Sequence, residues 1–318
     1  MRTVSIPGTD MTASCLGMGC ASLGSRISPR QGLAALAAAH ERGVTWYDVA
    51  PVYGAGEAEA ILATFLKGRR DRVLLCSKVG LAPPRRNGAL KLAYAAGRPV
   101  IGVARGLRRV FRGLSATRNR RVPLTPELIE TSLAQSLARL GTDRLDVFAL
   151  HDPDPADLGR AEILAALERV KRQGRVRYLS VAGTAEAAFA AAGSGVFDLF
   201  QLADDPALEP LAALRASLDR PAGFVTHSVL GVAGARERAA RRLSADPTLR
   251  AELAAAGYEG PPEAAAARLL LSRAFASNPE GVVLASMFSG RHLAENAAIA
   301  ERPVDPVACA LARKIFAG

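Results

Sequence analysis

The sequence predicts an α/β protein whose eight parallel strands close into a (β/α)8 (TIM) barrel. Short apolar runs alternate with helical patterns along the 318-residue chain, and this alternation is typical of a parallel sheet covered by helices. Two runs, 73–77 and 145–150, are apolar almost throughout, as strands buried on both faces are. A doubly wound sheet is the alternative, but no G-x-G-x-x-G motif follows the first strand.

The first strand and helix illustrate the local signals that set the element boundaries. The strand is expected at 14–21. Ser28 and Pro29 are typical of the cap and first turn of the helix that follows, and Gln31 is placed to close a capping box. Gly43 suits the left-handed residue that ends this helix.

The same unit is expected to repeat around the barrel. A small cap is expected over residues 1–12, and a final helix over 306–316 is expected to pack on the outside. Further strands are expected at 44–48, 73–77, 145–150, 176–181, 197–202, 223–227 and 281–285. Further helices are expected at 56–67, 127–140, 160–173, 186–192, 208–218, 233–255 and 262–277.

The composition favours one large domain. No linker rich in Pro, Gly or Ser divides the repeating units, so residues 1–318 are expected to form a single barrel domain with an insertion at about 80–124, after the third strand. The four cysteines have no CxxC spacing and are expected to be reduced thiols. No signal-peptide pattern and no run of about 18 uncharged apolar residues is visible, so a soluble cytoplasmic protein is expected.

The excess of positive charge lies in the insertion. The formal net charge is +11, and residues 85–121 hold eleven Lys or Arg and no Asp or Glu. Three interpretations stay open: a solvated loop, a lid whose cations attract an anionic substrate, or a surface helix that contacts anionic lipid or another macromolecule. No specific nucleic-acid binding is expected, because no binding motif is visible and only Tyr94 and Phe111 supply aromatic rings there.

Four chemically active side chains lie at or just beyond the C-terminal ends of predicted strands. Asp48 ends the second strand, Tyr53 follows in the next loop, and Lys78 and His151 follow the third and fourth strands. In a parallel barrel these ends form one mouth, where catalysis takes place. The alternative is that each is an isolated polar residue satisfied by solvent.

Together these four groups are suited to moving a proton. A free phenol has a pKa near 10 and is a poor acid or base at neutral pH. An ammonium group at Lys78 is expected to lower the pKa of Tyr53, and Asp48 is expected to keep that ammonium charged and in place. Tyr53 then gives or takes a proton, and His151 hydrogen-bonds the substrate oxygen.

The sequence resembles the aldo-keto reductase superfamily. The matching segments occur in the order of the family: LGMGCASLG at 16–24, D-V-A-P-x-Y-G at 48–54, Ser77-Lys78, His151 and HLAEN at 292–296. The resemblance implies a nicotinamide-dependent oxidoreductase that interconverts an aldehyde or ketone, such as a sugar, with its alcohol. The cofactor it implies is usually NADP, with NAD as the alternative. A monomer or weak oligomer without a metal is expected.

The resemblance also implies where the cofactor binds. The loop at 286–292 leads from the last strand into a helix, whose N-terminal N–H groups are suited to a phosphate. Arg291 is expected to reach the 2′-phosphate of the cofactor. The full set of expected cofactor residues is Gln201 for the carboxamide, His227 for the nicotinamide ring, Ser289, Gly290 and Arg291 for phosphate, and Asn296 for adenine. Without the resemblance, HLAEN could be an ordinary amphipathic helix start.

Several positions around the expected nicotinamide depart from the family pattern. Ala182-Gly183 stands where a Ser-Asn pair is common, His227 where a stacking Tyr is common, and Ser286 where a Lys is usual. These departures motivate an alternative function, a dinucleotide-binding sensor or partner subunit with little turnover. A second alternative is a lyase or isomerase that uses Lys78 as a Schiff-base amine.

Overall fold

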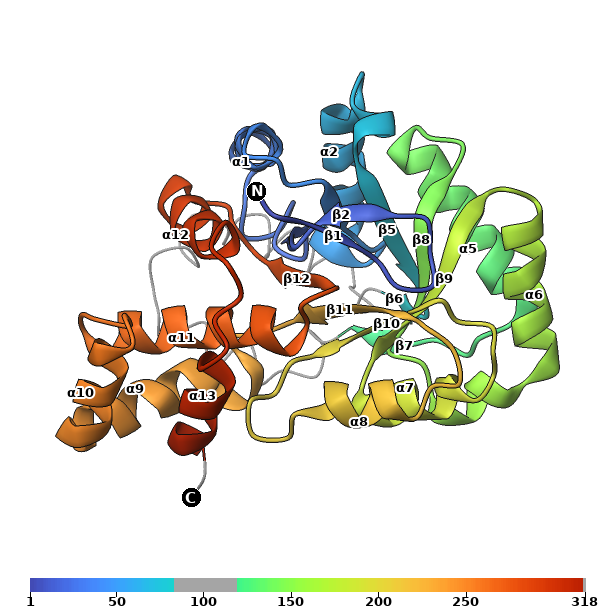
Figure 1. Ribbon diagram of the computed structural model, residues 1–318. Helices are drawn as coiled ribbons and strands as arrows, with labels where there is room; N and C mark the ends of the chain where they lie inside the picture. Colours follow the sequence, from blue (N-terminus) through green and yellow to red (C-terminus); the bar gives the residue numbers. More distant parts are fainter. Residues whose placement is uncertain (83–118, 317–318) are drawn as a thin grey trace.

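The computed structural model describes residues 1–82 and 119–316. Within them, eight parallel strands form a closed barrel and follow one another around it in chain order (Figure 1), which confirms the predicted fold class. The barrel strands are β3 (Leu16–Gly19), β4 (Trp46–Asp48), β5 (Leu74–Val79), β8 (Leu145–His151), β9 (Val176–Gly183), β10 (Leu199–Ala203), β11 (Gly223–His227) and β12 (Val282–Ala285).

Helices surround the barrel, and two short hairpins lie outside it (Figure 1). The helices are α1 (Pro29–Glu41), α2 (Glu57–Leu66), α5 (Pro126–Leu140), α6 (Ala161–Arg172), α7 (Ala185–Ala192), α8 (Pro210–Ala216), α9 (Ala235–Ala245), α10 (Pro247–Ala255), α11 (Pro262–Ser277), α12 (Gly290–Ala300) and α13 (Ala308–Phe316). The hairpins pair β1 (Thr3–Ser5) with β2 (Thr12–Ser14), and β6 (Leu81–Ala82) with β7 (Arg120–Arg121).

Local capping explains why several helices begin and end where they do. The hydroxyl of Ser28 accepts a hydrogen bond from the backbone N–H of Gln31, as expected of the N-cap of α1. The Gln31 amide, however, reaches the carbonyl of Phe288 at 3.3 Å instead of closing the expected capping box. This contact ties α1 to the loop that follows the last strand. At the other end of the helical unit, Gly43 has φ +83°, the left-handed conformation predicted for it.

Two expected boundaries differ from the structure for identifiable reasons. Residues 12–14 belong to the N-terminal hairpin, so the first barrel strand begins at Leu16 instead of residue 14. The expected helix at 233–255 is two helices, because Pro247 lacks the N–H that a continuous helix needs. Asp246 caps the second helix by accepting a hydrogen bond from the N–H of Leu249.

The main core fills the barrel and the space between the barrel and its helices. Side chains such as Leu16, Trp46 and Phe148 are at most 1% exposed, as expected of strands covered on both faces. A second, smaller apolar cluster lies where α9, α10, α11 and α13 meet. The predicted C-terminal helix, α13, therefore packs against other helices on the outside, at the lower left of Figure 1.

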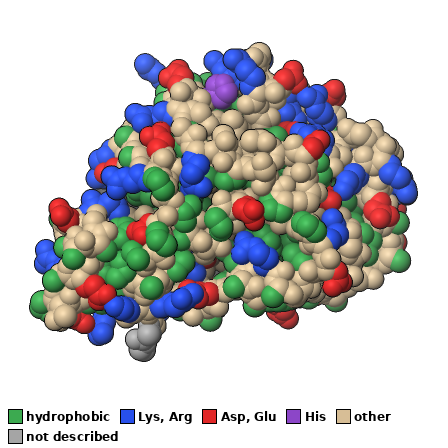
Figure 2. All heavy atoms as spheres, in the orientation of Figure 1, with side chains coloured by type: hydrophobic (Ala, Val, Ile, Leu, Met, Phe, Trp, Pro, Cys, Tyr) green, Lys and Arg blue, Asp and Glu red, His purple; other side chains and the backbone are tan. Residues whose placement is uncertain are grey.

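The surface of the described residues carries charges of both signs. On the face drawn in Figure 2, Lys and Arg side chains are interspersed with Asp and Glu. Most of the basic insertion expected at 85–121 lies outside the described residues, which resume at 119. In the part of the chain that the structure describes, no helix combines the length and apolar character needed to cross a membrane.

Candidate active site

The C-terminal ends of neighbouring barrel strands bring the four predicted side chains to one cavity. Asp48 is the last residue of β4, Lys78 the second-last of β5, and His151 the last of β8. These three strands are adjacent in the barrel. Tyr53 begins a short 3₁₀ turn, Tyr53–Gly56, just beyond β4. All four side chains line the same cavity.

Asp48 and Lys78 form a buried ion pair. The Lys78 Nζ lies 2.5 Å from Asp48 Oδ1 and donates a second hydrogen bond, of 3.2 Å, to the carbonyl of Val49. The two residues are 3% and 1% exposed, respectively. Burial opposes the charge on Lys78 and is the largest single influence, but Asp48 together with Tyr53 and Cys76 outweighs it and raises the pKa of the ammonium above its ordinary value. Lys78 therefore stays charged at neutral pH.

Tyr53 lies close to both this ion pair and His151. Its ring centroid is 5.3 Å from Lys78 Nζ and 5.7 Å from the centroid of the His151 imidazole. The two rings are nearly perpendicular, at 89°. An ammonium and an imidazole are thus grouped around the Tyr53 phenol ring on the wall of the cavity.

Lys78 acts on the pKa of Tyr53 in the predicted direction, but burial reverses the net shift. Burial is the largest influence and raises the pKa of the phenol above 10, while Lys78 lowers it and offsets only part of that rise. The lowering by Lys78 was expected, whereas the larger effect of burial was not, because the sequence does not reveal how deeply the ring is enclosed. Burial and the nearby Lys78 charge lower the pKa of His151 to about 3, so its imidazole is neutral at neutral pH.

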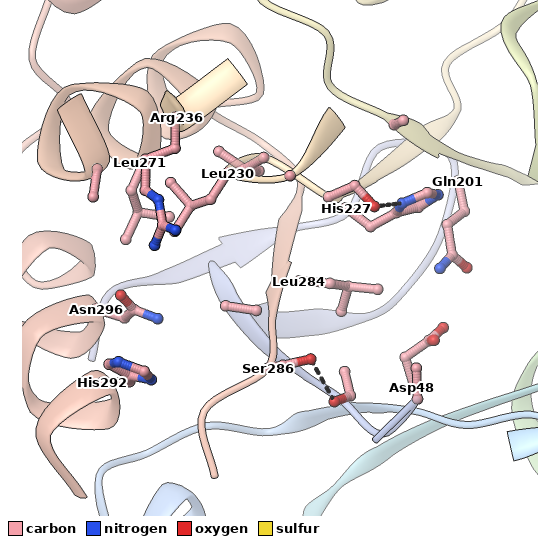
Figure 3. Close-up of a pocket in the computed structure, with 18 of the residues that line it drawn as sticks. Asp48, Gln201, His227, Leu230, Arg236, Leu271, Leu284, Ser286, His292 and Asn296 are labelled. Atoms are coloured by element: carbon pink, nitrogen blue, oxygen red, sulfur yellow. Dashed lines mark hydrogen bonds between the residues drawn. The ribbon is translucent and has the colours of Figure 1, made fainter. Parts of the chain in front are cut away.

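The cavity extends well beyond these four residues. Its volume is about 1260 Å³, larger than the roughly 300–1,000 Å³ usual for a small-molecule site. Figure 3 shows Asp48 and Gln201 at one side and Asn296, His292 and Arg236 at the other. A cavity of this size and shape has room for a two-part ligand such as a dinucleotide together with a small substrate.

Polar side chains in the cavity are available to such a ligand. Gln201, on β10, is 5% exposed, and its amide makes no hydrogen bond to any residue within 1–82 or 119–316. Asn296, on α12, also lines the cavity without a side-chain hydrogen bond among those residues. His227, at the end of β11, lines it too, and its Nδ1 is 2.9 Å from Ser228 Oγ. Because Gln201 and Asn296 border the cavity with amides that no described residue pairs, and His227 offers a planar ring, these residues fit a dinucleotide cofactor.

The predicted phosphate loop lies mostly outside the lining of the cavity. Ser289 and Gly290 are not among the residues that line the cavity, and the Ser289 hydroxyl caps α12 by accepting a hydrogen bond from the His292 N–H. Arg291 lines the cavity, but its side chain is 76% exposed and lies 3.7 Å from Glu295. His292, one helical turn before Asn296, shares its face of α12 (Figure 3).

Several residues outside the predicted catalytic and cofactor-binding set also line or border the cavity. Asp152 lines it and forms a two-point ion pair with Arg121, with distances of 3.0 and 3.1 Å. Arg236 on α9 and Arg268 on α11 line its other end. The helix at 262–277 was predicted, and the spacing of residues 264, 267, 268 and 271 on one face was the available signal for Arg268.

A model of the aldo/keto reductase family matches residues 15–196 of this chain. The chain belongs to the aldo-keto reductase family. The match covers more than half of the chain and includes the ends of the strands that carry Asp48, Lys78 and His151.

Three relatives illustrate the range of aldo-keto reductases that the chain resembles. It is 31% identical to a D-threo-aldose 1-dehydrogenase of Pseudomonas sp, over 67% of this chain and 65% of the relative. It is 26% identical to an NADH-specific methylglyoxal reductase of Escherichia coli, over 57% and 52%. It is 30% identical to a 6-dehydroglucose reductase of Agrobacterium fabrum, over 48% and 44%. The chain thus spans less than two thirds of each relative's length.

Solved aldo-keto reductases share the fold over nearly the whole chain. A holo-form enzyme from Bacillus halodurans superposes with a TM-score of 0.69 at 19% identity, covering 99% of this chain and 96% of the other. A thermostable member solved with the inhibitor epalrestat gives 0.70 at 20% identity, covering 99% and 100%. These comparisons support the barrel.

The positions that depart from the aldo-keto reductase pattern all lie along the cavity wall. Ala182, Gly183, His227 and Ser286 line it. Burial lowers the pKa of His227, so a neutral imidazole ring stands where the family often has a phenol. A neutral planar ring can still stack on another ring, whereas Ser286 supplies no positive charge for a phosphate.

Proposed function

We propose that the protein is an NADP-type oxidoreductase that interconverts an aldehyde or ketone with its alcohol, with Tyr53 as the proton donor or acceptor. The observation that carries this proposal is the position of the Tyr53 ring, 5.3 Å from the Lys78 ammonium and 5.7 Å from the His151 ring, at one end of a dinucleotide-sized cavity. A reduced nicotinamide, when bound, supplies the hydride that no side chain can supply.

The roles of the four side chains follow from their charges. In carbonyl reduction, Tyr53 gives its phenolic proton to the substrate oxygen as that oxygen gains negative charge. The neutral His151 donates a hydrogen bond to the same oxygen and orients the carbonyl. Lys78 stabilises the phenolate that remains, and Asp48 holds the ammonium in position. In alcohol oxidation, the phenolate of Tyr53 takes the proton instead.

Gln201 and Asn296 are the proposed amide contacts of the cofactor. Both line the cavity, and Figure 3 shows them on opposite sides of it. Gln201 is suited to the carboxamide of the nicotinamide because it lies on the same side as Asp48. Asn296 is suited to adenine at the other side, and His227 offers its ring to the nicotinamide.

A polyhydroxylated substrate, such as a sugar, is the proposed substrate class. Two relatives are named for reactions of aldoses or a dehydroglucose. The substrate side of the cavity also has a polar edge, since Asp152 lines it and is held by Arg121. Carboxylate oxygens at such a rim can accept hydrogen bonds from hydroxyl groups.

The Schiff-base alternative is disfavoured by the state of Lys78. An amine that attacks a carbonyl must be able to lose its proton, and enzymes achieve this by lowering the pKa of the lysine. Here the Asp48 carboxylate raises the pKa of Lys78 instead. The structure therefore supports a role for Lys78 as a permanent positive charge.

Cofactor titration followed by a carbonyl panel tests the proposal against the sensor alternative. The fluorescence of NADPH and NADH is followed as each is added to the protein, and turnover is then measured with aldoses, small aldehydes and ketones. Saturable binding with turnover supports the oxidoreductase. Saturable binding without turnover on any substrate favours the sensor, and absence of binding contradicts both.

A further inference from the structure

The end of the cavity opposite Asp48 is built by helices that follow the seventh and eighth strands. Figure 3 shows Leu230, Arg236 and Leu271 on one side of this end, with His292 and Asn296 of α12 facing them. This end of the cavity is rich in charged side chains. Four arginines and two glutamates line it: Arg236, Arg268, Arg291, Arg302, Glu263 and Glu295.

One face of α11 contributes a continuous stripe to this part of the wall. Residues Glu263, Ala264, Ala267, Arg268 and Leu271 all line the cavity, and their spacing places them on one side of the helix. Because Ala264 and Ala267 are small, a ligand can approach α11 closely beside Arg268. Arg268 lies one turn before Leu271, so it belongs to the same end of the cavity.

Arg268 differs from Arg236 and Arg291 in having no anionic partner, and from the exposed Arg302 in being partly buried. Within the described ranges, it makes no ion pair or side-chain hydrogen bond, and its Nε is buried without a partner. Arg236 lies 2.9 Å from Glu237, and Arg291 pairs with Glu295. The charge of the Arg268 guanidinium is therefore not balanced by any carboxylate of the described residues, and an anion in the cavity that Arg268 lines would supply the missing counter-charge.

The backbone beside Arg268 also leaves its guanidinium in a defined place. Gly260, just before α11, has φ +109°, and a Cβ on it would lie 3.4 Å from Arg268 Nη2. The turn at Gly260 therefore lies beside Nη2 of the guanidinium, and Arg268 also lines the cavity. This arrangement restricts the side chain in advance, which lowers the entropy lost when an anion binds.

We propose that Arg268 binds the 2′-phosphate of an NADP-type cofactor. This inference rests on the proposed function, in which Asn296 contacts adenine at the same end of the cavity. The phosphate on the adenosine ribose is then the anion nearest to α11. The guanidinium fork suits a phosphate because it can donate two parallel hydrogen bonds. The site thereby compensates for Ser286, which stands where the family usually has a lysine, and it replaces the solvent-exposed Arg291 as the specificity-determining cation.

The test compares dinucleotide affinities without any turnover. NADPH and NADH are titrated by fluorescence into the wild-type protein and into Arg268→Gln, Arg268→Lys, Arg291→Gln and Arg250→Gln. Arg250 is an exposed residue of α10 that does not line the cavity, so its variant is the matched control. Competition by 2′,5′-ADP and by 5′-ADP gives a second readout, which involves no nicotinamide.

The expected result separates the two dinucleotides. Wild type binds NADPH more tightly than NADH. Arg268→Gln weakens NADPH and 2′,5′-ADP by roughly tenfold to hundredfold, while NADH and 5′-ADP change by about twofold or less. Arg268→Lys keeps the charge and the long side chain, so its affinity for NADPH should lie between those of the wild type and Arg268→Gln. It replaces Arg268→Gln in the test if that variant does not fold. Arg250→Gln behaves as wild type.

Three results would overturn the inference. In the first, Arg268→Gln keeps the wild-type preference. In the second, Arg291→Gln removes the preference and Arg268→Gln does not. In the third, wild type binds NADH as well as NADPH. All three leave the proposed interconversion of carbonyl and alcohol in place, because a dinucleotide still binds, and the third removes only the preference for NADP. If the wild-type protein binds neither dinucleotide, both the inference and the proposed function fail.

Discussion

The ammonium nitrogen of Lys78 lies 2.5 Å from Oδ1 of Asp48, and the two side chains are 1% and 4% exposed. A buried ion pair of this kind contributes little net stability, because both charges lose their hydration. Its effect here is to keep a positive charge beside Tyr53 in a place where an isolated lysine would lose its proton. The pair is therefore expected to matter more for the proposed chemistry than for the stability of the fold, and variants of the two residues can separate these effects.

Removing one member of the pair is expected to destabilise the protein strongly. Asp48→Asn leaves the Lys78 ammonium buried without its counter-charge, so the free energy of unfolding should fall by about 3–5 kcal/mol. Replacing both members, with Asp48→Leu and Lys78→Met, should recover most of that loss while abolishing turnover. Unfolding in urea measures the three variants. Additive effects of the two sites would show that the pair is not coupled.

Loss of the Tyr53 hydroxyl is expected to slow turnover with little effect on the fold. Tyr53→Phe removes the proposed proton donor, and kcat for carbonyl reduction should fall by roughly 10²–10⁴-fold. Tyr178→Phe is the matched control, because the Tyr178 hydroxyl binds Asp10 and lies outside the cavity. Steady-state kinetics decides the point. Wild-type kcat in Tyr53→Phe on every accepted carbonyl would remove Tyr53 from the mechanism.

The free energy of unfolding is expected to decrease as the pH is lowered, because of His151. Its pKa is lowered to about 3 in the folded protein, whereas an unfolded histidine has a pKa of about 6.5. Below pH 6.5 the unfolded state binds a proton that the folded state does not. The contribution of His151 is therefore fully present above 6.5 and is lost as the pH falls toward 3, by at most about 1.4 kcal/mol per pH unit.

Comparison of the wild type with His151→Gln isolates this effect. Urea unfolding at pH 7, 6 and 5 should show a smaller loss of stability in the variant, because its side chain does not titrate. Burial also lowers the pKa of His227, so His227→Gln should remove a further part of the slope. Identical slopes in the wild type and His151→Gln would mean that His151 titrates normally in the folded protein.

A second buried ion pair holds the wall of the cavity together. Arg273 of α11 bonds Asp204, which follows β10, and the two side chains are 2% and 0% exposed. The backbone N–H of Asp204 also bonds the carbonyl of His227 at 3.2 Å. Arg273→Met should therefore lower the free energy of unfolding by about 3–5 kcal/mol.

The same variant should also weaken cofactor binding through His227. Chemical unfolding and a cofactor titration measure the two effects separately. The double variant Arg273→Met with Asp204→Leu is expected to regain much of the stability, because neither charge is then left alone. If Arg273→Met has the same free energy of unfolding as the wild type, the ion pair does not contribute to stability.

Much of the barrel could be predicted because its signals are local. Apolar runs, N-caps such as Ser28 and left-handed glycines such as Gly43 depend on a few neighbouring residues, and the structure has them where they were expected. The predicted element boundaries were wrong where a contact with residues remote in the sequence determined the structure. Residues 12–14 are not part of the first barrel strand because they pair with the N-terminal strand β1. Gln31 does not close the predicted capping box because its amide donates to the carbonyl of Phe288.

The end of the cavity that holds Asp48, Lys78 and His151 was predictable, and the opposite end was not. Asp48, Lys78 and His151 follow from one rule, that the C-terminal ends of parallel strands meet at one mouth. Arg268 obeys no such rule. It faces the cavity only because α11 packs with that side toward α12 and the barrel, and the sequence of an amphipathic helix does not say which neighbour its face will meet.

By itself, the sequence determined the order of strands and helices, the closed parallel barrel and the four polar side chains at its mouth, because these depend on residue type and spacing along the chain. Only the tertiary structure decided the electrostatic state of those side chains and the far wall of the cavity. Burial raises the pKa of Tyr53 and lowers that of His151, and packing leaves Arg268 without a partner among residues 1–82 and 119–316. Such properties arise from the distance to solvent and to charges that are remote in the sequence, and the sequence does not state those distances.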